Sequence, residues 1–111
     1  MGVNYEKVSE TLKALAHPAR LKIVAGLLKD ECNVARIQKV LGLPQSTISQ
    51  HLRVLKNAGI IKGRREGNKT CYRVIDVRVR KIVEIIKREQ IFFGALIVLF
   101  IYANKAINYG V

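Results

Sequence analysis

The sequence predicts a mainly α-helical domain with one small β-hairpin. Two observations carry this prediction. Apolar residues recur at spacings of three and four along most of the chain, and residues 60–75 instead form two β-rich runs around a Gly/Asn turn. The chain has 111 residues, the size of a single domain. Half of them are hydrophobic, which excludes a disordered basic tail.

Four helices are predicted ahead of the hairpin, because each segment places its apolar residues on one helical face. Pro18 suits the first turn of the second helix, and Pro44 opens the fourth. Gly42 suits the C-cap of the third helix. The predicted ranges are 5–16, 18–29, 34–41 and 44–57.

The hairpin is predicted from strands 60–64 and 69–75, joined by a turn at Glu66-Gly67-Asn68. Asp76 is a good N-cap for a last helix, in which apolar residues return to helical spacing. Four helices, a hairpin and a helix follow the order of a winged helix-turn-helix. We assign residues 1–90 to this domain and residues 91–111 to an apolar C-terminal extension.

The fourth predicted helix carries a polar face that suits the reading of DNA bases. Ile48, Leu52 and Leu55 take its buried stripe, and a tight turn at 41–44 lets the helix project into a major groove. Uncharged hydrogen-bonding side chains near the helix start are suited to base edges. A merely solvated face would carry more Lys and Glu. The candidate DNA-binding residues on this helix are Gln45, Ser46, Thr47, Ser49, Gln50, His51 and Arg53.

The hairpin region is strongly basic, in a chain whose net charge is +12. Solubility alone would mix the two signs of charge, whereas a wing lying along phosphates needs cations. A polyanion is therefore the expected partner, with nucleic acid ahead of an anionic membrane surface. Residues 53–73 hold Arg53, Lys56, Lys62, Arg64, Arg65, Lys69 and Arg73 against the single acid Glu66.

Three motifs in order resemble the ArsR/SmtB family of repressors, at residues 12–23, 43–52 and 55–61. The resemblance implies a homodimer on double-stranded DNA that binds an inverted-repeat operator, with the first and last helices in the dimer interface. It also implies an effector that lowers DNA affinity. By position, it assigns base reading to Gln45, Ser46, Ser49 and Gln50. The same alignment assigns backbone contacts to Arg64, Arg65 and Lys69.

The metal-binding positions of that family are not matched. The thiolate positions read Asn33 and Ala35, and the site on the last helices reads Asp76, Arg78, Glu89 and Phe92. Arginine cannot ligate a cation. We therefore expect no metal and no cofactor, and the identity of the effector stays open.

Cys32 and Cys71 lie 39 positions apart and form no CxxC or Cys/His cluster. We favour the interpretation that both are small buried side chains. The alternative is redox sensing by the pair, although Cys71 falls on a wing strand and so departs from the family's usual cysteine pairing.

Residues 91–103 contain no charge or strong polar group. An apolar helix of this kind must be buried in a core or in a bilayer. We favour burial against the partner subunit, because a run of this length is more often a core helix than a membrane span. A C-terminal membrane anchor and a lid over a hydrophobic effector are the alternatives.

The function predicted is that of a sequence-specific, cytoplasmic transcriptional repressor. No secretory signal precedes residue 17, and no nucleophile, base and carboxylate set indicates an enzyme. The alternatives are a DNA-coating architectural protein that binds without sequence preference, and a regulator tethered to the membrane through residues 91–111.

Overall fold

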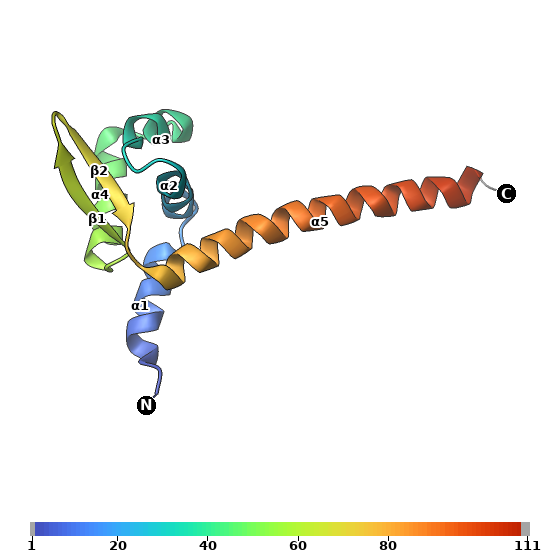
Figure 1. The fold of residues 1–111 in the computed structure, drawn as a ribbon, viewed down its shortest axis with the longest axis horizontal. Helices are drawn as coiled ribbons and strands as arrows, with labels where there is room; N and C mark the ends of the chain where they lie inside the picture. The colour runs from blue at the N-terminus through green and yellow to red at the C-terminus, as the bar shows by residue number, and fades with distance from the viewer. Residues whose placement is uncertain (1, 110–111) are drawn as a thin grey trace. The chain divides into compact units, whose positions relative to one another are not determined.

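The computed structural model describes the backbone of residues 2–109 and the side chains of residues 2–89 and 94–105. It confirms a mainly helical chain with one two-stranded antiparallel hairpin (Figure 1). The backbone forms two compact units, Met1–Arg80 and Lys81–Val111. The elements are α1 (Tyr5–Leu15), α2 (Pro18–Lys29), α3 (Val34–Leu41), α4 (Gln45–Asn57), β1 (Ile61–Glu66), β2 (Lys69–Val74) and α5 (Val77–Tyr109).

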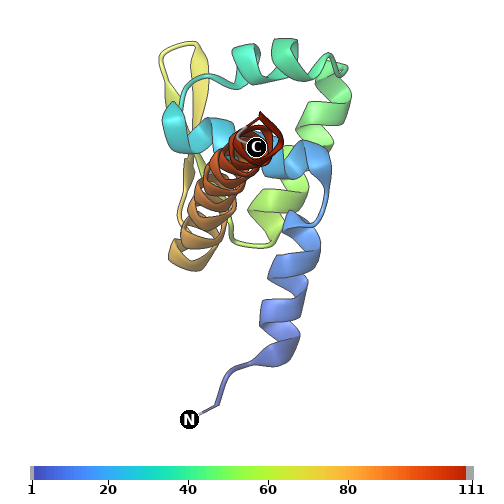
Figure 2. The ribbon, with the colours of Figure 1, turned by 90° about the vertical axis from the view of Figure 1, so that its right-hand side faces the viewer.

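The helix boundaries follow local capping signals. His17 caps α2, since its Nδ1 accepts the backbone N–H of Ala19 at 3.1 Å. Gly42 ends α3 with a left-handed φ of 65°, which glycine adopts without steric cost. Pro44 is the N-cap of α4, so the helix begins one residue later than predicted. Figure 2 shows α3 passing into α4 through this sharp turn.

The wing is longer at its tip than the sequence predicted. Glu66, which we placed in the turn, belongs to β1 and pairs with Lys69 of β2. The turn is therefore only Gly67-Asn68, and Gly67 supplies the positive φ of 60° that a two-residue hairpin turn requires. Asp76 follows the wing as predicted, and its Oδ1 accepts the backbone N–H groups of Arg78 and Val79 at the start of α5.

The core of the first unit lies among α2, α4 and the base of the wing. Gly26 lets α3 approach α2 closely, because a Cβ there would meet the Ile37 side chain at 2.8 Å. The burial of aliphatic side chains supplies the main stabilisation of such a core. Its most deeply buried members include Ile23, Val24, Leu27, Leu55, Ile60, Cys71 and Val79.

The last helix continues through the apolar segment that the sequence singled out. Residues 94–105 are exposed in the single chain, with Phe100 at 67%. The side chains of residues 90–93, Phe92 among them, and of residues 106–111 lie outside the described set. The predicted boundary at residues 90 and 91 therefore stays a prediction. Among the residues the structure describes, none of the helices combines the length and apolarity needed to cross a membrane.

Candidate nucleic-acid interface

The N-terminal half of α4 presents an uncharged polar surface. Its buried side chains are Ile48, Leu52 and Leu55, as the sequence predicted. Among the uncharged polar residues predicted to contact DNA on this helix, Thr47 alone is half-buried. The predicted base-reading residues Gln45, Ser46, Ser49 and Gln50 are all exposed, and Arg53 follows them on the solvent side.

His51 is not on that exposed surface. Its ring lies 4.6 Å from the ring of His17, and its Nδ1 is 3.4 Å from a guanidinium nitrogen of Arg20. Burial, together with the neighbouring His17 and Arg20, lowers the pKa of His51 below its ordinary value. We expected His51 outside the buried stripe, whereas the structure shows it half-buried, and its contact with DNA stays a prediction. Position 51 is three residues after Ile48 and four before Leu55, which places it beside the buried stripe.

The cations of the wing fall into two groups. Arg65 and Lys69 lie exposed near its tip, and within the described part of the chain neither takes part in an ion pair. Arg64 instead bonds Glu31 at 2.6 Å and Glu66 at 2.8 Å. The hydrogen bond to Glu66, followed by the one to Glu31, raises the pKa of Arg64. The predicted phosphate contact of Arg64 thus competes with two carboxylates.

A groove of about 470 Å³ lies between the helix-turn-helix and the wing. It brings together predicted DNA-binding residues from both elements, with Gln45 and Ser49 on α4 and Lys69 on β2. Cys32 contributes to the same lining. Residues predicted to read bases and residues predicted to contact the backbone therefore meet at one groove, which the α2–α3 loop also borders.

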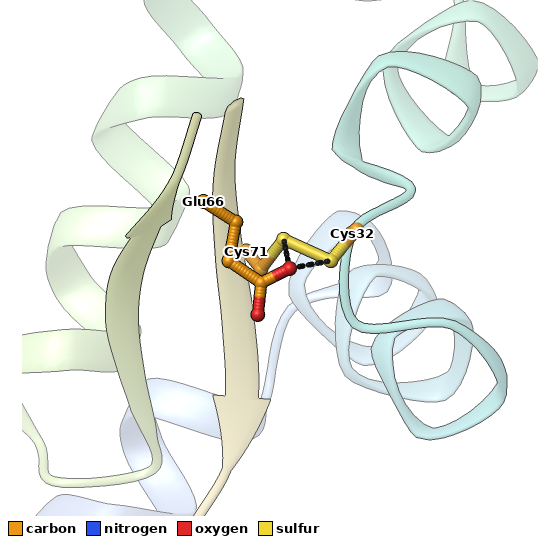
Figure 3. Close-up of side chains that lie close together, drawn as sticks. All are labelled: Cys32, Glu66 and Cys71. Carbon is orange, nitrogen blue, oxygen red and sulfur yellow. Dashed lines mark hydrogen bonds between the residues drawn. A yellow bond between two sulfur atoms is a disulfide. The ribbon is translucent and has the colours of Figure 1, made fainter. Parts of the chain in front are cut away.

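The two cysteines form a disulfide, with their Cα atoms 4.2 Å apart. The favoured expectation of two separate buried thiols was therefore wrong. Cys71 is fully buried on β2, and Cys32 is half-buried in the α2–α3 loop. Glu66 Oε2 lies 3.8 Å from the Cys32 sulfur and 3.7 Å from the Cys71 sulfur (Figure 3).

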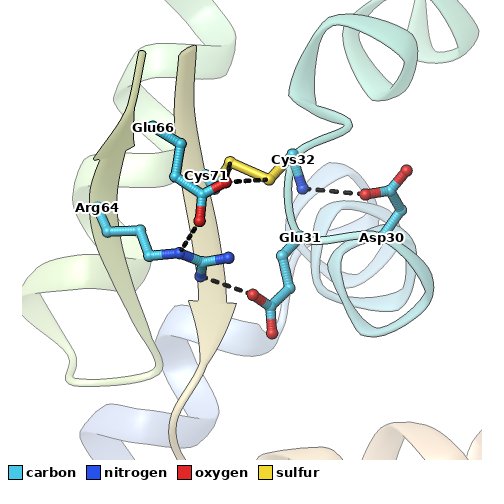
Figure 4. Close-up of a disulfide and its surroundings, with 6 residues drawn as sticks. All are labelled: Asp30, Glu31, Cys32, Arg64, Glu66 and Cys71. Carbon is cyan, nitrogen blue, oxygen red and sulfur yellow. Dashed lines mark hydrogen bonds and ion pairs between the residues drawn. A yellow bond between two sulfur atoms is a disulfide. The ribbon is translucent and has the colours of Figure 1, made fainter.

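The loop carrying Cys32 is held against the wing by further contacts (Figure 4). The backbone N–H of Tyr72 donates to the carbonyl of Glu31 at 2.8 Å, and the Glu31 carboxylate bonds Arg64. Asp30 orients the loop by accepting the backbone N–H of Cys32 at 3.1 Å. Sequence reasoning missed this cluster, because its members come from three segments and no spacing signal connects them.

Comparison with known proteins agrees with this architecture. The model of the "Bacterial regulatory protein, arsR family" matches residues 17–62. An uncharacterized HTH-type transcriptional regulator of Methanocaldococcus jannaschii is 42% identical over 83 residues, covering 74% of this chain and 93% of that protein. The transcriptional repressor PagR of Bacillus anthracis is 39% identical, covering 79% of this chain and 89% of its own length.

Solved structures give the same result. HlyU from Vibrio cholerae superposes with a TM-score of 0.72 at 34% identity, covering 79% of this chain and 96% of its own. A homodimeric winged helix-turn-helix DNA-binding domain from Mycobacterium bovis superposes with a TM-score of 0.67 at 30% identity, covering 78% of this chain and 80% of its own. Fold and surface together define a DNA-binding transcriptional regulator of the winged helix-turn-helix class. The chain belongs to the ArsR family, as a transcriptional repressor and not an enzyme.

Proposed function

We propose that the protein represses transcription in the cytoplasm by binding an inverted-repeat operator as a homodimer. The observation that carries the proposal is the groove at which the exposed polar side chains Gln45 and Ser49 of α4 meet Lys69, an exposed cation of the wing. Uncharged side chains at the start of a recognition helix distinguish base pairs, whereas wing cations gain affinity by neutralising phosphates. The two elements therefore have separable roles.

In this proposal Gln45, Ser46, Ser49 and Gln50 read base edges. Glutamine pairs with adenine by two hydrogen bonds, and serine contacts several bases. Arg53, Arg65 and Lys69 contact the phosphate backbone. Arg64 contributes less, because Glu31 and Glu66 already neutralise its charge.

The proposed dimer uses the first and last helices. An inverted repeat matches the two-fold symmetry of a dimer whose recognition helices face successive major grooves. The neighbour from Mycobacterium bovis is itself homodimeric. The exposed apolar segment 94–103 of α5 supports the same assignment, since a second copy would remove side chains such as Leu99 and Phe100 from water.

The test is fluorescence anisotropy of the reduced protein on the DNA upstream of its own gene, competed with scrambled duplex of equal length. We expect the upstream duplex to bind more tightly. Arg65→Ala should weaken every duplex alike and lower the salt slope by about one, whereas Gln45→Ala should relax the preference at one base pair. Equal competition by scrambled duplex would support architectural binding without sequence preference. Identical behaviour of the two variants would contradict α4 as the reader.

The disulfide supports a second role, the control of DNA binding by oxidation. A hydroperoxide would oxidise one thiol to a sulfenic acid with release of an alcohol, and the second thiol would then displace water to form the S–S bond. The bond fixes the α2–α3 loop to β2 at the edge of the DNA-facing groove. We expect operator affinity to differ at least about fivefold between the reduced and oxidised protein, and Cys32→Ser should abolish this difference. Equal affinities would exclude the role.

A further inference from the structure

Three potential metal ligands converge at the wing from separate segments of the chain. The sulfurs of Cys32 and Cys71 and one oxygen of Glu66 all lie within 4.8 Å of one another. They come from the α2–α3 loop, β2 and the end of β1 (Figure 3). Thiolates together with a carboxylate form a donor set typical of zinc.

Contacts that do not depend on the S–S bond also join the loop to the wing. The Tyr72 to Glu31 backbone hydrogen bond and the Arg64 to Glu31 ion pair join the loop to both strands of the wing. Proteins that bind DNA inside cells work where thiols are kept reduced. In that state we expect two neighbouring thiols and a carboxylate to stay close to one another.

The two separations between oxygen and sulfur match a four-coordinate ion, and reduction of the S–S bond frees the two sulfurs to move apart as two thiolate ligands require. With a Zn–S bond of about 2.3 Å and a Zn–O bond of about 2.0 Å, tetrahedral geometry puts sulfur and oxygen about 3.5 Å apart. The two observed separations are 3.7 and 3.8 Å. Three protein ligands leave the fourth position to water.

The surrounding charges suit the same occupant. Two thiolates and one carboxylate around a divalent cation leave a single negative charge, and the Arg64 guanidinium lies beside it. Arg64 bonds the other oxygen of Glu66, Oε1, at 2.8 Å and so leaves Oε2 directed at the sulfurs. Outer-shell hydrogen bonds of this kind orient a carboxylate ligand and support metal affinity (Figure 4).

We propose that the reduced protein binds one zinc-class divalent cation through Cys32, Cys71 and Glu66. The site differs from both metal positions of the related repressors that the sequence failed to match, and it replaces our expectation that the chain binds no metal. It rests neither on the operator proposal nor on control by oxidation.

The experiment is an anaerobic titration of the fully reduced, desalted protein with Cd²⁺ as the probe. The ultraviolet cadmium–thiolate absorption band reports binding, and a thiol assay first verifies both free cysteines. We expect saturation at one ion per chain. Cys32→Ser should remove most of the band. Glu66→Gln should weaken binding at least about tenfold, the loss that even an outer-shell partner causes. Glu10→Gln, an exposed carboxylate on α1, is the matched control and should bind as the wild type does.

The variants separate the ligand set from effects on folding. Cys32 is half-buried and in a loop, so its serine variant tests the site without disturbing the core, whereas Cys71 is fully buried. Circular dichroism of each variant verifies the fold. Absence of a band in the wild type, or an equal band in Cys32→Ser, would overturn the site. Unchanged affinity in Glu66→Gln would overturn the three-ligand assignment. None of these outcomes bears on operator binding, because no DNA is present.

Discussion

Helix α4 and the wing border the same groove, yet different forces hold them in place. Helix α4 is fixed by its apolar stripe, and within the described residues it has no ion pair or disulfide. The wing has an apolar base of its own, with Ile61 and Val74 buried. Its outer half is tied to the α2–α3 loop by a disulfide and by Arg64. A count of wing cations therefore overstates the charge available to DNA.

Reduction of the disulfide should have the largest effect on stability among the changes that test this contrast. The bond closes a segment of 39 positions, and constraint of the unfolded chain over that length corresponds to about 4 kcal/mol of unfolding free energy. Urea unfolding with and without a reductant measures the difference. Cys32→Ser is the control, and its stability should not respond to the reductant. Equal midpoints in the wild type would show that the bond constrains nothing.

Leu55→Ala tests the apolar side of the contrast. Leu55 has no exposed surface, and truncation of a buried leucine costs about 3 kcal/mol. The loss should be equal in reduced and oxidised protein, because α4 is not involved in the disulfide. Val54→Ala, one position along on the exposed side, should cost less than about 1 kcal/mol. If reduction enlarged the Leu55→Ala effect, helix and wing would not be held independently.

Arg64→Ala and Arg65→Ala sharpen the comparison within the wing itself. A phosphate contact contributes about 0.9 to the slope of log affinity against log salt concentration. We expect Arg65→Ala to remove about that amount and Arg64→Ala less than half of it, since Arg64 is already paired with Glu31 and Glu66. Anisotropy titrations over a series of salt concentrations give the slopes. Equal slopes in the two variants would mean that Arg64 leaves its carboxylates when DNA binds.

The smallest expected effect is the pH dependence that His51 confers. Its pKa is below the ordinary 6.5 in the folded chain, so the unfolded chain takes up the proton first as pH falls. The contribution of the neutral His51 ring to the free energy of unfolding is complete above pH 6.5. It is lost as the pH falls through the pKa that His51 has in the folded chain. His51→Gln should therefore show a smaller decrease in Tm below pH 6.5 than the wild type. An unchanged pH profile would assign the dependence to other groups.

The sequence predicted the helices well because their signals are local. Capping by Asp76, the left-handed Gly42 and the stripe of Ile48, Leu52 and Leu55 depend on residues within a few positions of one another. The exposed polar face of α4 followed from the same periodicity. His51, which we expected on the exposed surface, is instead half-buried beside the stripe.

Sequence alone determined the class of this protein, because helical periods, turn residues and net charge are properties of short segments or of composition. Tertiary structure decided which side chains are bonded to one another. It paired Arg64 with Glu31 across 33 positions and joined Cys32 to Cys71 across 39. Contacts of that range depend on how the loop and the wing pack. No period or spacing in the chain encodes them, and only the folded molecule brought the two sulfurs and Glu66 together.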